Sequence, residues 1–346
     1  MDDVKKKNDA FEAIIKGVAE EIKPGEERTF LEAAIDPCTL VIIGASGDLT
    51  HRKLLPALFN LYLNRSLPEP FLIVGAARTE MSDEDFRARS REAIMGRNPH
   101  DLQQWEAFAS LLRYFPVEYA DAPSFKRLAD KLQDLDQKQG TGGNRIFYLA
   151  IPPMLCETTA QMLGRVGLSG EGSGGKGWSR IVVEKPFGRD LRTAMILDRT
   201  LHKHFREHQI FRIDHYLAKE TVQNVLMLRF ANAIFEPLWN RNYIDSIRIT
   251  AAESMGIENR AGYYEQSGVL RDMFQNHMMQ LLSLTAMEPP SLFEADRVLD
   301  EKAKLYRALR PFPVDNLQGA IVLGQYRQGT VNGKRVPAYR EERGVR

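Results

Sequence analysis

One stretch of nine residues, Arg212 to Glu220, combines the side chains that acid–base chemistry on an anionic substrate needs. It reads Arg-Ile-Asp-His-Tyr-Leu-Ala-Lys-Glu and precedes an apolar helical pattern formed by Val222, Val225, Leu226 and Leu228. Anions bind well at a helix N-terminus, because N–H groups there lack internal partners and the helix dipole is positive. If the helix ran through the stretch, His215 and Lys219 would lie on one face at i and i+4, and Tyr216 and Lys219 at i and i+3. The stretch therefore predicts a phosphoryl clamp, the alternative being a solvated helical turn of mixed charge.

His277 is the second candidate, on the apolar face of a helix predicted over residues 268–285. The same stripe contains Leu270, Phe274, Leu281 and Leu282. One interpretation is a core histidine with a single hydrogen bond. The other pairs it with the carboxylate of Asp214, since an aspartate orients an imidazole and stabilises its protonated form, as a general base requires. Asp272 and Asn276 also lie close by in the sequence.

Lys185 is the third candidate because it directly follows a predicted buried strand, Ile181-Val182-Val183. The carboxyl ends of parallel strands face the ligand crevice of such sheets, so Lys185 is expected to meet substrate or cofactor. A merely solvated lysine is the alternative. Pro186 after it is compatible with a cis peptide bond or a hinge.

A nucleotide-binding signal lies further upstream. The apolar run Leu40-Val41-Ile42-Ile43 predicts a buried strand, Gly44 to Thr50 follows as a glycine-containing turn, and a helical pattern begins near Leu54. Strand, glycine turn and helix in this order are typical of the front half of a dinucleotide-binding unit. The pattern is Gly-x-x-Gly and not the full three-glycine fingerprint, so an ordinary strand-to-helix turn remains the alternative.

The next predicted strand, residues 71–75, indicates which dinucleotide is bound. It runs into Ala76-Ala77-Arg78-Thr79, with no acidic residue where a ribose 2′-hydroxyl would be recognised. An arginine at this position suits a 2′-phosphate instead. Arg78, together with the Ser46 hydroxyl, therefore favours NADP over NAD, the alternative being a surface arginine after an edge strand.

The rest of the chain predicts an α/β fold. A helical pair over residues 83–112, a strand at 115–119, a helix at 124–138 and a strand at 145–150 continue the alternation of a parallel, doubly wound sheet. The alternating segment Ile244 to Thr250 instead suits an antiparallel sheet covered on one side. We therefore expect a helical extension at residues 1–36, a Rossmann domain at 37–211, and an α+β domain with a mainly antiparallel sheet at 212–346.

Composition bounds the class of protein. The 346 residues are 43% hydrophobic and 27% charged, which is typical of a globular protein. Lysine and arginine total 47 against 46 acidic residues, so the net charge of +1 favours neither nucleic acid nor membrane as a partner. Two cysteines, Cys38 and Cys156, lack metal-ligand spacing and fit a reducing compartment. With no apolar run of transmembrane length and no signal sequence, the expected location is the cytoplasm, and no metal is expected.

Taken together, these motifs resemble the glucose-6-phosphate dehydrogenase family, NADP-dependent oxidoreductases of carbohydrate metabolism that open the pentose phosphate pathway. The resemblance runs in order from residue 39 to the end of the chain. Arg212 to Glu220 is its most specific segment and departs only at Ala218, where the family usually has glycine. The other matching segments are Gly44 to Leu49 with Lys53, Val74 to Arg78, Glu184 to Gly188, and Arg271 to His277.

The resemblance implies a role for each candidate residue. His277, oriented by Asp214, would take the proton from the C1 hydroxyl of glucose 6-phosphate while the hydride passes to the nicotinamide. His215, Tyr216 and Lys219 would hold the phosphate. The remaining substrate residues would be Lys53, Lys185, Glu253 and Asp272, with Lys185 also near the nicotinamide. NADP would be bound by Gly44, Ala45, Ser46, Gly47, Asp48, Leu49 and Arg78.

The resemblance also implies that the chain stops about a third short of the usual family length. The remaining part would contribute sheet strands, substrate-binding lysines and much of the homo-oligomer surface, so a sheet edge and apolar surface are expected to be exposed. Two alternatives stay open: a non-catalytic NADP-binding fragment, and another Rossmann-type sugar oxidoreductase. Arg212 to Glu220 disfavours the latter.

Overall fold

The structure, a computed structural model, describes residues 36–95, 102–172, 177–257, 260–311 and 313–345. The predicted helical extension therefore lies outside the described residues, except for Asp36. Two compact units divide the chain. Unit 1 is Met1–Glu184 with Met195–Arg212, and unit 2 is Lys185–Ala194 with Ile213–Arg346.

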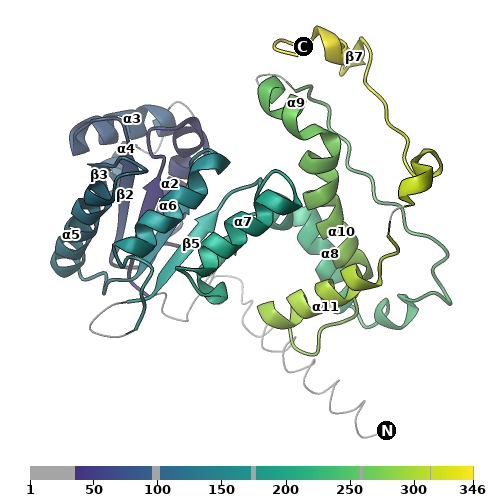
Figure 1. The fold of residues 1–346 in the computed structure, drawn as a ribbon, viewed down its shortest axis with the longest axis horizontal. Helices are drawn as coiled ribbons and strands as arrows, with labels where there is room; N and C mark the ends of the chain where they lie inside the picture. Colours follow the sequence, from purple (N-terminus) through teal and green to yellow (C-terminus); the bar gives the residue numbers. More distant parts are fainter. Residues whose placement is uncertain (1–35, 96–101, 173–176, 258–259, 312, 346) are drawn as a thin grey trace, which may run out of the picture. The chain divides into compact units, whose positions relative to one another are not determined.

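Unit 1 is built on a six-stranded parallel sheet of order β3-β2-β1-β4-β5-β6, which confirms the predicted Rossmann-like architecture (Figure 1). From β1 the chain first adds β2 and β3 on one side of the sheet and then β4, β5 and β6 on the other. The order therefore reverses between β1 and β4, and the carboxyl ends of these two strands border the topological switch point where such folds bind nucleotides. The strands are β1 (Cys38–Ile43), β2 (Phe71–Ala77), β3 (Leu112–Pro116), β4 (Arg145–Leu149), β5 (Ser179–Val183) and β6 (Ile210–Arg212).

Helices cover the sheet because its central strands are apolar on both faces. Alternate residues of β1, namely Cys38, Leu40 and Ile42, pack in one hydrophobic core with side chains of α2, α3 and α4. The helices α5 and α6 contact each other. The helical elements are a π-turn, η1 (Thr50–Leu54), then α2 (Leu55–Leu63), α3 (Asp83–Met95), α4 (Leu102–Ala109), α5 (Ala122–Gln139), α6 (Pro153–Arg165), α7 (Leu191–His202) and η3 (Glu207–Gln209).

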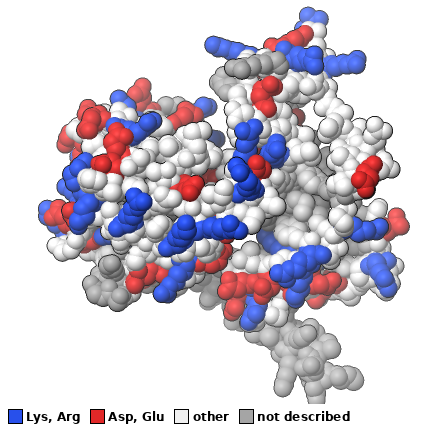
Figure 2. All heavy atoms as spheres, viewed as in Figure 1, with Lys and Arg blue, Asp and Glu red and all other residues white. Residues whose placement is uncertain are grey.

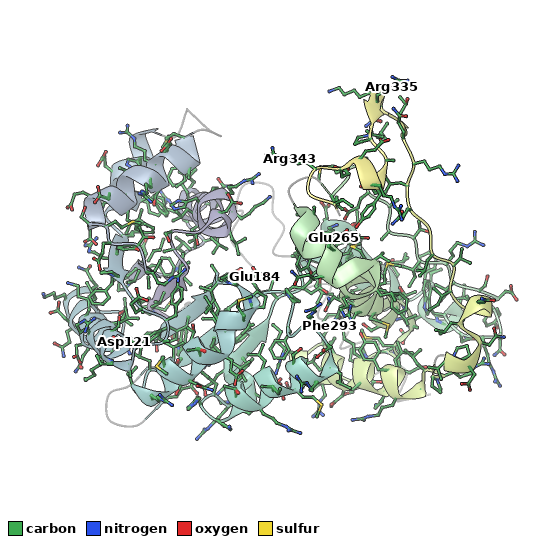
Figure 3. The ribbon with its side chains drawn as sticks, turned by 45° about the horizontal axis from the view of Figure 1, so that its top comes forward. Asp121, Glu184, Glu265, Phe293, Arg335 and Arg343 are labelled. Atoms are coloured by element: carbon green, nitrogen blue, oxygen red, sulfur yellow. The ribbon has the colours of Figure 1, made fainter. Side chains whose placement is uncertain are left out.

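The helix α5 of unit 1 shows how local sequence sets the two ends of a helix. Asp121, labelled in Figure 3, accepts a hydrogen bond from the backbone N–H of Ser124 at 2.9 Å and so caps the first turn. At the other end Gly140 adopts φ +76°, the left-handed conformation that commonly closes a helix. The predicted helix at 124–138 is confirmed.

Unit 2 is mainly helical. Its α8 and α11 both pack against α10, and the buried Arg229 of α8 donates hydrogen bonds to the carbonyls of Leu284 and Met287, at the end of α10. The elements are η4 (His215–Ala218), α8 (Glu220–Phe230), η5 (Glu236–Leu238), α9 (Ala261–Val269), η7 (Leu270–Met278), α10 (Met279–Ala286), α11 (Ala295–Ala308), η8 (Val314–Gly319), β7 (Gly329–Val331), β8 (Lys334–Val336) and η9 (Tyr339–Glu341). Glu265, labelled in Figure 3, accepts a hydrogen bond from the Tyr339 hydroxyl and ties η9 to α9.

Two expectations about strands need correction. Ile244 to Thr250 forms no strand: the described part of unit 2 contains one two-stranded antiparallel sheet, β7-β8, and Ile247 is 47% exposed. An alternating pattern supplies one apolar face, but a strand also needs a neighbour for its backbone groups. In unit 1, the strand expected at 115–119 is instead Leu112–Pro116, because its partner β2 ends at Ala77, opposite Pro116.

Unit 1 shows no patch of a single charge on the part of the visible face that the structure describes. In Figure 2 its acidic and basic side chains are interspersed over the face shown. Among the described residues, no helix combines the length and apolar character needed to cross a membrane.

Candidate active site

The stretch Arg212 to Glu220 positions its side chains with a tight turn instead of an α-helix. His215–Ala218 is a 3₁₀ turn capped by Asp214, whose carboxylate accepts the Tyr216 backbone N–H at 3.0 Å, and α8 begins only at Glu220. The i, i+4 arrangement considered from the sequence is therefore not formed. The Lys219 ammonium lies 3.6 Å from the centre of the Tyr216 ring, so a cation–π contact positions this side chain.

An aspartate–histidine pair joins two segments of unit 2. His277, 1% exposed, comes from η7, and its Nδ1 is 2.6 Å from the Asp214 carboxylate. Because a carboxylate only accepts hydrogen bonds, Nδ1 must carry the proton, which leaves the Nε2 lone pair as an acceptor. The Tyr216 ring stacks on the imidazole at 4.0 Å and 14°, which fixes its plane. The buried position predicted from the apolar stripe is thus combined with a carboxylate partner.

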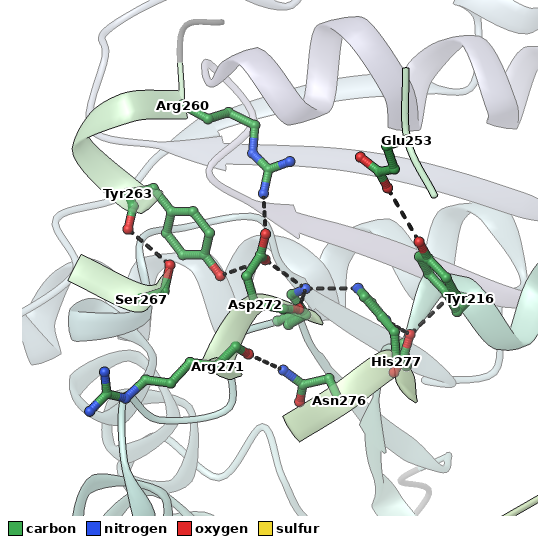
Figure 4. A network of polar contacts seen from close by, with 11 residues as sticks. Tyr216, Glu253, Arg260, Tyr263, Ser267, Arg271, Asp272, Asn276 and His277 are labelled. Carbon is green, nitrogen blue, oxygen red and sulfur yellow. Dashed lines mark hydrogen bonds and ion pairs between the residues drawn. The ribbon is translucent and has the colours of Figure 1, made fainter. Parts of the chain in front are cut away.

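Lys185 occupies the other side of the same imidazole. Its ammonium is 2.8 Å from His277 Nε2, and it donates to the backbone carbonyl and carboxylate of Asp272 at 2.6 and 2.9 Å. The peptide bond between Lys185 and Pro186 is cis. One continuous polar network within unit 2 thus joins three separate segments, in the order Asp272, Lys185, His277 and Asp214. Asp272 and His277 of this network are labelled in Figure 4.

The network holds His277 neutral. Burial of the imidazole lowers its pKa below the ordinary value of 6.5, the positive charge of Lys185 lowers it further, and Asp214 opposes both effects. Asp272 is shifted down as well: burial alone would raise its pKa, but the hydrogen bond and charge of Lys185, and then Arg260, outweigh it. At neutral pH the geometry therefore presents an unprotonated Nε2 beside a cation.

Sequence reasoning missed two contributors to this network. The Arg260 guanidinium and the Tyr263 hydroxyl bind the Asp272 carboxylate at 3.0 and 3.2 Å, as Figure 4 shows. Their i, i+3 spacing at the start of α9 was the available signal, but nothing in the sequence connects that helix to Asp272. Of the predicted residues, Glu253 is exposed and accepts from the Tyr216 hydroxyl at 3.2 Å, while His215 and Lys219 are exposed beside it.

A metal would fit this site poorly. Asp214, His215 and His277 do offer ligand atoms within 4.8 Å of one another. Ligation through His277 Nδ1 would move its proton to Nε2, where it would oppose the Lys185 ammonium, and ligation through Nε2 would place two cations together. The arrangement is better suited to moving a proton.

We expect Lys185→Met to raise the pKa of His277, because it removes the nearby positive charge that lowers it. The variant also leaves the buried Asp272 with Arg260 and Tyr263 alone, at a cost of about 3 kcal/mol in the free energy of unfolding, the lower end for a broken buried ion pair. Histidine NMR titration and urea unfolding measure the two effects. Lys304→Met, which removes an exposed ion pair to Glu301, is the matched control and should change neither. An unchanged or lower His277 pKa in Lys185→Met would contradict the assigned contact.

The predicted nucleotide-binding residues lie in unit 1. The turn after β1 is tight: Gly44 has φ +102°, and a Cβ there would lie 2.2 Å from the Ala150 carbonyl oxygen. The Thr79 hydroxyl donates to Ser46 Oγ at 3.2 Å, linking the turn to the end of β2, and the exposed Arg78 guanidinium lies 5.5 Å from the Tyr119 ring centre. Lys53 is exposed on η1 of the same unit. Strand, turn and helix thus have the predicted order.

Comparison with known proteins identifies the family. The family profile "Glucose-6-phosphate dehydrogenase, NAD binding domain" matches residues 41–224, and "Glucose-6-phosphate dehydrogenase, C-terminal domain" matches residues 226–346. The chain is 49% identical to glucose-6-phosphate 1-dehydrogenase of Aggregatibacter actinomycetemcomitans and 48% identical to that of Treponema pallidum, covering 89% and 90% of this chain. It spans 62% and 60% of the lengths of those relatives.

Solved structures agree. A glucose-6-phosphate dehydrogenase in complex with its substrate glucose-6-phosphate superposes with a TM-score of 0.79 at 34% identity, over 90% of this chain and 62% of that one. The Mycobacterium avium glucose-6-phosphate 1-dehydrogenase gives 0.73 at 32% identity, over 89% and 62%. With its Rossmann-like sheet, its matched profiles and these relatives, the chain belongs to the glucose-6-phosphate dehydrogenase family.

Proposed function

We propose that this chain provides the catalytic site for oxidation of glucose 6-phosphate at C1 to the 6-phosphogluconolactone, with hydride transfer to NADP, the first step of the oxidative pentose phosphate pathway. One observation carries the proposal: a neutral imidazole, His277, whose Nδ1 is bound to Asp214 and whose Nε2 accepts a hydrogen bond at 2.8 Å. Oxidation of an alcohol needs a base of this kind for the hydroxyl proton.

In this mechanism His277 Nε2 takes the proton of the C1 hydroxyl. The resulting imidazolium stays hydrogen-bonded to Asp214, which compensates its charge. The hydroxyl must then occupy the position from which the Lys185 ammonium now donates to Nε2, so substrate and Lys185 share this part of the site. Asp272 keeps Lys185 within reach through two hydrogen bonds. NADP, when bound, supplies the hydride acceptor.

The phosphate of the substrate is assigned to the turn after Asp214. His215 and Lys219 are exposed there, and Tyr216 Oη connects the turn to Glu253. Because the aromatic ring of Tyr216 lies between Lys219 and His277, the phosphate grip and the base are held at a fixed spacing. Binding the remote phosphate then orients C1 toward Nε2.

Lys219→Ala should lower affinity for glucose 6-phosphate by about ten- to a hundred-fold, because one charge-assisted hydrogen bond to the phosphate is lost. The turnover number should change little, since the base is untouched. Calorimetric titration with glucose 6-phosphate measures the affinity, and Lys304→Ala serves as the control at an exposed lysine of the same unit. Equal affinity in Lys219→Ala and the parent chain would remove the phosphate role.

NADP as the preferred dinucleotide is supported by unit 1. The tight Gly44 turn leads into a helix start, which is suited to a pyrophosphate, and Arg78 with Ser46 suits a 2′-phosphate where no carboxylate follows β2. Gly44 to Leu49 and Arg78 are the residues we assign to the cofactor, with Lys185 expected beside the nicotinamide.

The direct test mixes the purified chain with NADP and glucose 6-phosphate and follows absorbance of the reduced cofactor. We expect a rate with glucose 6-phosphate and none with unphosphorylated glucose. NADP binding without turnover would favour the alternative of a non-catalytic nucleotide-binding fragment, and turnover of other sugars would favour a different sugar oxidoreductase.

A further inference from the structure

A pocket of about 440 Å³ in unit 1 adjoins the nucleotide-binding turn but contains residues that no motif assigned. Its lining combines the turn and η1 on one side with α3 on the other: Ser46, His51, Arg52, Arg89, Glu92 and Ala93. Three of these side chains are basic. A pocket that is lined by Ser46 and these basic side chains is suited to an anion bound next to the turn.

His51 and Arg89 come from different elements and converge on this pocket. His51 is half-buried on η1, which packs against α3, and Arg89 lies on the second turn of α3. Ser46, which lines the pocket, accepts a hydrogen bond from the hydroxyl of Thr79, the residue after Arg78. The pocket therefore places Ser46, one of the two residues assigned to the 2′-phosphate, beside a second arginine and a histidine.

We propose that His51 and Arg89 bind the adenosine 2′-phosphate of NADP together with Arg78, and that protonation of His51 makes the preference for NADP over NAD increase as the pH falls. This inference rests on the proposed function, in which unit 1 binds NADP. Arg89 supplies a permanent charge at the site, while His51 supplies one that depends on pH.

Burial and the neighbouring charges set the direction of the His51 pKa shift, and with it the direction of the pH effect on NADP preference. Burial lowers the pKa of His51, Arg89 on α3 lowers it further, and Asp48 on the turn opposes them. Arg52 is paired with Asp48 at 3.3 Å, and Glu92 of α3 is the acidic residue that lines the pocket. Without nucleotide, His51 is thus mostly neutral at pH 7. A phosphate dianion would offset the repulsion from Arg89 and raise the His51 pKa, and by linkage a protonated His51 binds that phosphate more tightly.

The experiment isolates the 2′-phosphate by comparing adenosine 2′,5′-bisphosphate with 5′-AMP. Dissociation constants are measured by calorimetry at pH 6 and pH 8 for the 346-residue chain, His51→Gln, Arg89→Gln and the control Arg91→Gln. Arg91 is exposed on the same helix and does not line the pocket. The phosphate itself titrates near pH 6. Each result is therefore expressed as the ratio of the dissociation constants of 5′-AMP and the bisphosphate, divided by the same ratio for His51→Gln at the same pH.

On lowering the pH from 8 to 6, the preference of the parent chain for the bisphosphate should rise about five-fold relative to His51→Gln, the difference between a neutral and a charge-assisted hydrogen bond. Arg89→Gln should lose about ten-fold in bisphosphate affinity at both pH values, with 5′-AMP affinity unchanged, and Arg91→Gln should match the parent. NMR titration should show the His51 pKa rising with the bisphosphate and not with 5′-AMP.

Each contrary result would overturn a different part of the proposal. If the parent chain binds neither nucleotide nor NADP, the proposed cofactor role of unit 1 is wrong. If it binds NADP, but His51→Gln and the parent show the same pH dependence, the inference about His51 alone is overturned. Equal loss of both nucleotides in Arg89→Gln would place Arg89 outside the 2′-phosphate site.

Discussion

Replacing His277 with asparagine should lower the turnover number by about 10²–10⁴-fold, the usual contribution of a positioned general base. Asparagine can still donate to Asp214 in place of Nδ1–H, so the surrounding network is preserved, but it offers no basic nitrogen at the Nε2 position. Affinity for glucose 6-phosphate should stay roughly constant, because the turn at His215 to Lys219 is unchanged. Initial rates and calorimetric titration measure the two quantities.

His208→Asn is the matched control for this substitution. His208 is an exposed histidine of unit 1 that contacts Glu171 at 2.8 Å, outside the candidate site. It should retain the parent rate. If His277→Asn kept more than about a tenth of the parent turnover, a loss smaller than general-base catalysis supplies, another group would have to be the base.

Asp214→Asn should have the second largest effect on turnover, about 100-fold or more, because a neutral amide does not stabilise the imidazolium that forms when His277 takes the proton. The charge effect has a definite sign. Asp214 raises the pKa of His277, so removing its charge should lower that pKa further, while the positive charge of Lys185 remains. Rate measurements and histidine NMR of the same variant report both consequences.

The Asp214 prediction also separates catalysis from folding. Asparagine can still accept the Tyr216 backbone N–H, so the cap of the 3₁₀ turn survives. The thermal midpoint should therefore fall by no more than a few degrees while the rate falls strongly. A large loss of stability with an unchanged rate per folded molecule would make Asp214 a structural residue.

Much of unit 1 could be predicted because its signals are local. The run Leu40-Val41-Ile42-Ile43 is a central strand, and a buried parallel strand needs no more than a short apolar segment between turn signals. The ends of α5 are also set by local residues, Asp121 at the N-cap and Gly140 at the C-cap. Strand ends are less local: β3 stops where its neighbour β2 stops, which residues 112–119 cannot encode by themselves.

In unit 2 the residue types were easier to predict than their arrangement. The pairing of His277 with Asp214 followed from the chemistry of the two side chains, and the structure places the two atoms 2.6 Å apart. The contact of Lys185 with Nε2 did not follow, because it depends on three segments meeting in space. The strand predicted at 244–250 was wrong for a related reason: pairing depends on a neighbour that the pattern itself does not specify.

The pH dependence of stability follows from the same imidazole. Its folded pKa lies below the unfolded value of 6.5, so the neutral form is favoured by folding. The corresponding contribution to stability is fully present above pH 6.5 and is lost as the pH falls from there through the folded pKa. In His277→Asn this part of the pH dependence should be absent.

The central claim is that Nε2 of His277 is an unprotonated acceptor while Nδ1 donates to Asp214, and ¹⁵N NMR of the imidazole tests it most directly. In the parent chain at pH 7, we expect a neutral ring with its proton on Nδ1, and a titration midpoint below 6.5. A proton on Nε2, or a ring that is already cationic at pH 7, would mean that His277 has no lone pair to offer the C1 hydroxyl and would contradict the mechanism.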